Sequence, residues 1–121
     1  MNYKHIILTR FNLQYDLQSN IHIQDSWLEE RFRLFEQYCF PSIIAQTNQQ
    51  FDWVILVSDQ TPKNYLSRLA KHTNSHLNIY IELCTYYEDV NVLYNNIGEK
   101  YVHGYDYLLS TRVDNDDMLA K

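Results

Sequence analysis

The sequence is short of glycine and of positive charge. Only two of its 121 residues are glycine, Gly98 and Gly104, where average usage would give about eight. Neither a G-x-G-x-x-G fingerprint nor a P-loop can be built from them, so two common nucleotide-binding devices are excluded. The formal net charge of -5 and the pI near 5.4 argue against a protein that binds nucleic acid by neutralising phosphates.

Long apolar runs and cysteine clusters are also missing. The longest apolar run, residues 53–57, is far short of the roughly 20 residues that a membrane span needs. Arg10 follows the first apolar stretch too soon for a signal peptide. We therefore expect a cytoplasmic setting, or one peripheral to the inner face of the membrane. Cys39 and Cys84 form no C-x-x-C, and we expect both to be reduced thiols.

What the sequence does contain is enough apolar material for one domain, residues 1–121, because 45% of the chain is hydrophobic. Short apolar segments predict four strands, at residues 4–10, 53–57, 77–83 and 105–113. The second is apolar at every position, which is typical of a strand inside a parallel sheet. The third alternates between apolar and polar residues, which indicates a strand with one wet face, nearer an edge.

Helical spacing of apolar residues predicts helices between these strands. Ser26 and Glu29 form a capping box at the start of the first helix, and Pro41 interrupts it. Thr61 is the expected N-cap of the second, with Pro62 at its first position. The apolar stripes of the first and third helices are Leu28, Phe32, Phe35 and Cys39, and Val90, Tyr94, Ile97 and Tyr101.

The order of strands and helices predicts an α/β domain with three layers, in which helices cover both faces of a mostly parallel sheet. Ligands of such sheets bind outside the carboxyl ends of the strands. That rule selects three polar clusters, which follow the first, second and fourth strands: residues 9–11, 58–59 and 114–117.

The last of these clusters is acidic and contains Asp114, Asp116 and Asp117. Two carboxylates 4 Å apart repel by about 4 kcal/mol at an effective dielectric constant near 20, so such a cluster favours a cation. Mg²⁺ or Mn²⁺ suits carboxylate oxygens. An ordinary solvated acidic turn is the alternative, and the D-x-D-D string alone leaves both open.

Several motifs, taken in order, resemble a known family. Residues 40–47 (FPSIIAQT) lead into 51–59 (FDWVILVSD), and 95–100 (NNIGEK) precede the strand that ends in the acidic cluster. This arrangement resembles the opening half of GT-A glycosyltransferases of the family-2 type. Residues 8–12 (LTRFN) and 111–117 (TRVDNDD) are similar to the rhamnosyltransferase branch of these enzymes. The resemblance implies a GT-A fold with the strand order 3-2-1-4.

The resemblance also implies roles for the acidic residues. Asp59 matches the aspartate that contacts the base of a nucleotide-sugar donor. Asp114 and Asp116 match the two ends of the D-x-D motif, which meets the ribose and holds Mn²⁺ or Mg²⁺ against the diphosphate. Asp117 is a candidate contact to the sugar. The chain departs from the family at residues 60–62, where a second Asp and a Gly-Ser often stand.

Three further residues fall at positions where such enzymes meet the nucleotide or its charge. Thr9 and Arg10 lie where the nucleotide binds, and Arg112 would complement the negative charge of the donor. For the arginines an alternative stays open: Arg112 as a partner of the neighbouring aspartates, and Arg10 as a plain cation at the sheet edge.

The implied reaction moves a sugar from a dTDP- or UDP-sugar to a hydroxyl of a glycan or lipid-linked acceptor. In this family the general base and the acceptor pocket follow the D-x-D motif, so we expect no catalytic base within residues 1–121. We expect a donor-binding half, truncated after the motif, inactive by itself and self-associating as a homo-oligomer. The alternative is a non-catalytic module that binds a nucleotide or a protein, for which eleven tyrosines would furnish the surface.

Overall fold

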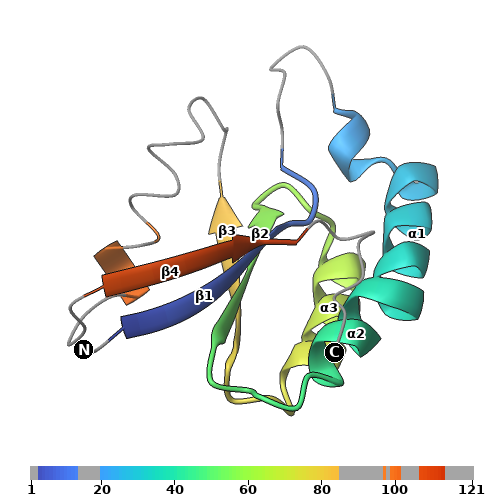
Figure 1. Ribbon diagram of the computed structural model, residues 1–121. Coiled ribbons are helices and arrows are strands. Elements are labelled where there is room, and N and C mark those ends of the chain that lie inside the picture. The colour runs from blue at the N-terminus through green and yellow to red at the C-terminus, as the bar shows by residue number, and fades with distance from the viewer. Residues whose placement is uncertain (1–2, 14–19, 85–96, 98, 102–106, 114–121) are drawn as a thin grey trace.

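The computed structural model describes residues 3–13, 20–84, 97, 99–101 and 107–113, which form a sheet and the helices packed on it (Figure 1). In chain order the elements are β1 (Tyr3–Arg10), the 3-10 turn η1 (Ile21–Ile23), α1 (Asp25–Leu34), the π-helical segment η2 (Phe35–Cys39), α2 (Phe40–Ile44), β2 (Asp52–Ser58), α3 (Lys63–Thr73), β3 (Ile79–Cys84) and β4 (Tyr107–Arg112).

The four strands make one parallel sheet in the order β3-β2-β1-β4, so the predicted order 3-2-1-4 is confirmed. β1 is paired on both sides: Leu8 lies opposite Val54 of β2 and Arg112 of β4. Every residue of β2 after Asp52 is buried, as its unbroken apolar run predicts. β2 lies inside the sheet because its side chains are apolar on both faces and need apolar contacts on both.

Helices pack on both faces of the sheet, which confirms the predicted α/β architecture (Figure 1). The α1–α2 arm and α3 cover one face, where their apolar side chains meet those of β1 and β2 in a core that includes Phe32, Phe35 and Trp53. On the other face Ile97 packs against Val54 and Leu56 in a smaller cluster. In the described ranges no helix has the length and apolarity to cross a membrane.

The predicted helix starts are wrong by one or two residues. The N-cap of α1 is Gln24, and no side chain caps this end, so the capping box at Ser26 does not form. The N-cap of α3 is Pro62 rather than Thr61. The hydroxyl of Thr61 instead donates to the carbonyl of Ser58 at 2.7 Å.

The interruption predicted at Pro41 takes the form of a wider turn. η2 precedes the proline, and the N–H of Phe40 donates to the carbonyl of Phe35, five residues back. Proline lacks an N–H and its ring clashes with the preceding turn, so a π segment accommodates it without ending the helical arm. The predicted apolar stripe is confirmed, with its members at most 1% exposed: Leu28, Phe32, Phe35 and Cys39.

The third strand is at the sheet edge as expected, but it starts two residues late. Leu77, assigned to its buried face, lies in the preceding turn and is 95% exposed. Leu83, near the end of this edge strand, is also exposed, at 57%. The third predicted helix, from residue 90, lies mostly outside the described residues; Ile97 is buried, and residues 99–101 are helical.

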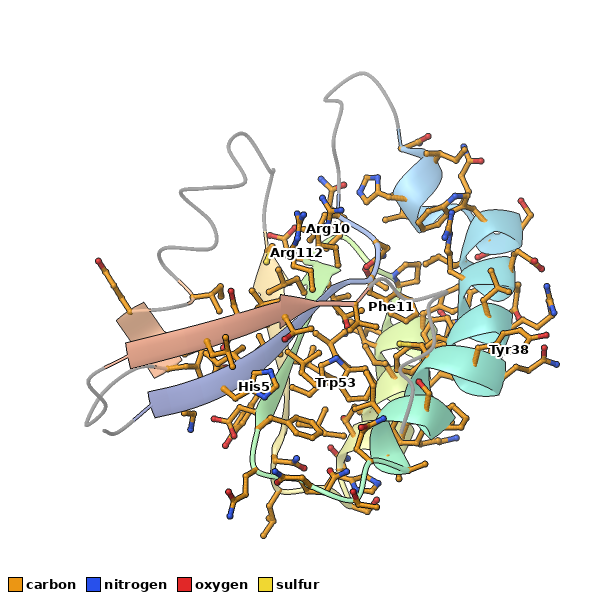
Figure 2. All side chains as sticks on the ribbon, in the orientation of Figure 1. His5, Arg10, Phe11, Tyr38, Trp53 and Arg112 are labelled. Carbon is orange, nitrogen blue, oxygen red and sulfur yellow. The ribbon has the colours of Figure 1, made fainter. Side chains whose placement is uncertain are left out.

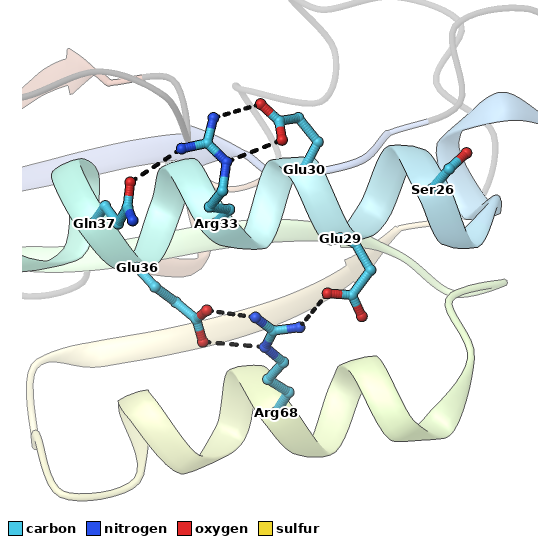
Figure 3. Close-up of a pocket in the computed structure, with 7 residues that line it drawn as sticks. All are labelled: Ser26, Glu29, Glu30, Arg33, Glu36, Gln37 and Arg68. Atoms are coloured by element: carbon cyan, nitrogen blue, oxygen red, sulfur yellow. Dashed lines mark hydrogen bonds and ion pairs between the residues drawn. The ribbon is translucent and has the colours of Figure 1, made fainter.

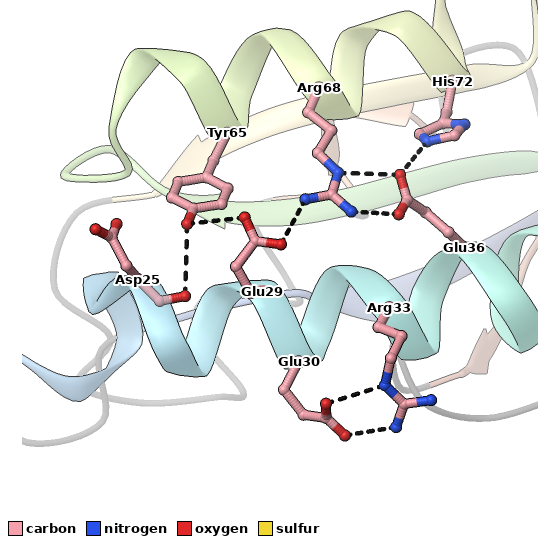
Figure 4. A network of polar contacts seen from close by, with 8 residues as sticks. All are labelled: Asp25, Glu29, Glu30, Arg33, Glu36, Tyr65, Arg68 and His72. Carbon is pink, nitrogen blue, oxygen red and sulfur yellow. Dashed lines mark hydrogen bonds and ion pairs between the residues drawn. The ribbon is translucent and has the colours of Figure 1, made fainter.

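Charged side chains join α1, η2 and α3 on the outer face of the domain (Figure 4). The Arg68 guanidinium binds Glu36 of η2 at 2.5 and 3.1 Å and Glu29 of α1 at 3.0 Å. Nε2 of His72 lies 2.6 Å from the second Glu36 oxygen. The hydrogen bond from Arg68, helped by the one from His72, lowers the pKa of Glu36 although burial opposes the shift.

We expect Glu36→Gln to lower the free energy of unfolding by about 1 kcal/mol at pH 7, because Arg68 loses its main anionic partner. Since the folded-state pKa of Glu36 lies below its ordinary 4.5, this contribution is complete above pH 4.5. It is lost as the pH falls through the lowered value. Urea denaturation at pH 7 and pH 3 measures it. Glu30→Gln, which removes only the exposed pair with Arg33, is the control and should have little effect; equal losses at both pH values would contradict the ion-pair account.

Candidate functional site

The carboxyl ends of β1, β2 and β4 lie at the same edge of the sheet, and backbone hydrogen bonds hold them together past the strand ends. The N–H of Phe11 donates to Leu56 and the N–H of Val113 to Leu8, both at 2.9 Å. The N–H of Asp59 donates to Cys84 at 2.8 Å. The segments that follow the strands therefore start from fixed positions at this edge.

The Asn12 side chain connects three of the segments at this edge. It is 1% exposed, and its Oδ1 accepts a hydrogen bond from the Ser58 N–H at 3.2 Å. Its Nδ2 donates to the His22 carbonyl at 3.1 Å and to the Thr61 hydroxyl at 2.7 Å. The partners fix the orientation of the amide, since a backbone N–H can only donate and a carbonyl can only accept.

Thr9, predicted to meet the nucleotide, is buried at the end of β1. Its side chain is fully inaccessible, and its hydroxyl accepts a hydrogen bond from Nε1 of Trp53 at 2.8 Å. That bond joins β1 to β2 across 44 residues of sequence and satisfies the buried indole. The hydroxyl thus has a structural partner, while its contact with a nucleotide stays a prediction.

Arg10 and Arg112 lie close together where β1 and β4 end (Figure 2). Arg112 is opposite Leu8 in the register, so it is diagonal to Arg10, and parallel strands in register point these side chains to the same face. Arg112 is exposed and Arg10 is partly buried. The structure therefore brings together the two predicted cationic residues. Arg10 is on the strand next to β2, and Arg112 is on the strand beyond it.

Asp59, the predicted contact to a base, is exposed just after β2. Its charge reaches the neighbouring strand end: burial raises the pKa of the Cys84 thiol to about 11, and Glu82 and Asp59 add to the rise. The thiol is therefore protonated and unreactive at neutral pH. The exposed carboxylate of Asp59 sits beside a neutral group at this edge.

The acidic residues predicted to bind metal and sugar, Asp114, Asp116 and Asp117, lie outside the described residues. The description ends at Val113, whose N–H is bonded to β1. Their contribution to a site stays a prediction.

Sequence reasoning missed His22, whose carbonyl accepts one of the Asn12 hydrogen bonds. Its ring is 3% exposed, and within the described part of the chain its Nε2 has no hydrogen-bond partner. Burial lowers the pKa of His22, although a contact with Gln60 opposes the shift. A buried polar atom without a partner costs about 1–3 kcal/mol, a cost that a ligand at this edge could relieve. Nothing local in residues 20–24 signals the burial of this ring.

A hollow between α1 and α3 is a weaker candidate for a ligand than the sheet edge (Figure 3). Its charged groups are already paired: Arg68 with Glu36 and Glu29, and Arg33 with Glu30. A charged ligand would have to break these pairs. The sheet edge, where Asp59 is exposed, is therefore the better candidate.

We expect Asn12→Asp to destabilise the protein by about 2–4 kcal/mol at pH 7. The new carboxylate would be buried against the His22 carbonyl, because one oxygen would replace the Nδ2 group and its two N–H donors. Burial raises the pKa of this carboxyl, so the loss should shrink as the pH falls towards 4 and the group takes up a proton. Denaturation at both pH values tests this. Asn64→Asp, at an exposed position, is the matched control. An equally small effect at both sites would contradict the structural role of the Asn12 hydrogen bonds.

One comparison with known proteins identifies the family. A family model described as "Putative rhamnosyl transferase" matches residues 4–121, nearly the whole chain and every motif on which the resemblance rests. No curated protein and no solved structure matches the chain. The chain belongs to the rhamnosyl transferase family.

Proposed function

We propose that this chain binds the nucleotide-sugar donor of a metal-assisted sugar transfer at the carboxyl edge of its sheet. The donor is a dTDP- or UDP-sugar, and the acceptor is a hydroxyl of a glycan or of a lipid-linked saccharide. The observation that carries the proposal is the arrangement of one exposed carboxylate, Asp59, and two guanidiniums, Arg10 and Arg112, around the end of β1.

The arrangement suits a ligand with two different ends. Neighbouring strands lie about 4.8 Å apart, so the ends of β2 and β4, on either side of β1, are separated by roughly 10 Å. The nucleobase has N–H groups that can donate hydrogen bonds to an aspartate, and Asp59 lies on the β2 side. A diphosphate is anionic and fits the arginine side, where Arg10 and Arg112 provide donors in the geometry that phosphate oxygens prefer.

A divalent cation completes the proposal on chemical grounds. Asp114 follows Val113 directly in sequence and Asp116 comes two residues later, and their carboxylates are the hard oxygen ligands that Mg²⁺ and Mn²⁺ take. In this proposal Asp117 contacts the sugar. When bound, the cation supplies Lewis-acid stabilisation of the charge that develops on the diphosphate leaving group.

The residues of this chain would orient the donor and balance its charge. The arginines offset the negative charge of the diphosphate, and this matters most as the bond to the sugar breaks. Asn12 keeps the segments after β1 and β2 at a fixed separation through its bonds to Ser58 and Thr61. Asp59 fixes the base, and thereby where the sugar lies.

Calorimetric titration with UDP, dTDP and GDP, each with and without Mn²⁺, tests the proposal. We expect one of the three to bind, and Mn²⁺ to raise its affinity. By linkage, the nucleotide should raise the affinity for Mn²⁺ by the same factor. Asp116→Asn should abolish this coupling and leave the circular dichroism spectrum unchanged. If none of the nucleotides binds below about 1 mM in either condition, the proposal fails and the interaction-module alternative stands.

Asp59→Ala should weaken the nucleotide roughly 10- to 100-fold both with and without Mn²⁺, because it removes a hydrogen bond to a charged group on the base side. Glu30→Ala is the matched control, since this exposed carboxylate lies on α1. It should leave the affinity unchanged. An effect of Asp59→Ala seen only with Mn²⁺ would place Asp59 at the metal and contradict its assigned role.

A further inference from the structure

The outer edge of β3 carries backbone groups that point away from the sheet. The N–H of Trp53 donates to Asn78 and the N–H of Asp59 donates to Cys84. In a parallel ladder only every second residue faces the neighbouring strand. With the register of Trp53 opposite Ile79, the even-numbered residues of this strand bond to β2. The N–H and C=O groups of Ile79, Ile81 and Leu83 therefore face outward, and no strand in the described part of the chain pairs with them.

This edge has few of the features that usually prevent one strand from pairing with another. Natural edge strands are protected by lysine, proline, bulges or inward-pointing charges. The β3 sequence, IYIELC, has no lysine, arginine, proline or glycine. Three apolar or aromatic side chains beside it are exposed: Leu77 at 95%, Leu83 at 57% and Tyr80 at 39%.

The charge along this edge is balanced, which matters because each chain carries a net charge of -5. Glu82 is the one ionisable carboxylate of β3, and it is held by an ion pair with Lys100 and by the Tyr101 hydroxyl at 2.6 Å. Two chains could meet along β3 without bringing unpaired negative charges together.

We propose that β3 is the contact between two copies of this chain, paired antiparallel about a two-fold axis at Ile81. The two four-stranded sheets then form one continuous sheet. In such a contact each residue meets a symmetry-related partner. Ile81 faces itself, and Ile79 faces Leu83 of the second copy on the same side of the sheet, so the exposed leucine is covered. Tyr80 faces Glu82 on the other side.

The two neighbouring registers are less favourable. An axis at Glu82 would place the two Glu82 carboxylates directly opposite each other, and like charges at such positions are destabilising. An axis at Tyr80 moves the contact toward Leu77, which lies in a turn rather than in the strand. The axis at Ile81 keeps the paired segment within β3. This proposal does not depend on the donor site, which lies at the strand ends.

Sedimentation of the chain across micromolar to tens-of-micromolar concentrations tests the contact. We expect a dimer for the wild type. Ile81→Pro should dissociate it, because proline removes an outward N–H and leaves the bonds to β2 in place. Leu83→Lys should weaken it roughly tenfold or more, since the charge enters the contact twice. Leu109→Lys, at a similarly exposed leucine of β4, should leave the dimer intact.

A monomeric wild type, or a dimer that survives both β3 substitutions, would overturn the proposal. A dimer lost with Leu109→Lys instead would assign the contact to β4. Circular dichroism shows whether the Ile81→Pro variant folds. If that variant does not fold, Leu83→Lys still tests the contact, because Leu83 is exposed.

Cross-linking determines the register. Residues opposite each other in a hydrogen-bonded antiparallel pair have Cα atoms about 5.5 Å apart, within the range of a disulfide. In a Cys84→Ser background, Ile81→Cys should therefore give a covalent dimer on mild oxidation. Tyr80→Cys should not, because its symmetry mate is more than about 7 Å away in this register. The reverse result would exclude the axis at Ile81.

Discussion

Parallel pairing on both sides of β1 is the constraint on which the rest of the structure depends. Because β2 and β4 run in the same direction as β1 and are in register with it, their carboxyl ends come to one edge, and this brings Arg10, Asp59 and Arg112 to the same edge. Side chains alternate along a strand, so a slip of one residue would exchange buried Thr9 with Arg10. The bonds from Trp53 to Thr9 and from Ser58 to Asn12 hold β1 and β2 against such a slip.

The parts of the fold that could be predicted are those set by local periodicity. The unbroken apolar run of β2 is sufficient to place it inside the sheet, and the four-residue and three-residue spacing of Leu28, Phe32 and Phe35 is sufficient to define the buried face of a helix. The positions of Arg10, Asp59 and Arg112 at one edge follow from the strand ends alone. Sequence spacing encodes these features because each depends only on which face a residue occupies.

What could not be predicted depends on partners distant in the sequence. Thr61 has the chemistry of an N-cap, but Asn12, 49 residues earlier, donates to its hydroxyl. His22 is buried beside the same amide, although its immediate neighbours are those of an exposed turn. Pro41 indicates a disturbance without indicating its form. A π turn holds more residues than an α turn, and one lies at Phe35–Cys39, before the proline.

The pairing of β1 with β4 also has a consequence for the order in which the chain is made. β2 is complete at Ser58, but β4 ends at Arg112, more than fifty residues later. At about 5–20 residues per second, synthesis of this interval takes roughly 3–11 s. During that time one edge of β1 has no strand beside it, and Ile6 and Leu8 lack part of their cover. The nascent chain is then most exposed to misassociation or to binding by chaperones, because β1 gains its second neighbouring strand only when β4 has been synthesised.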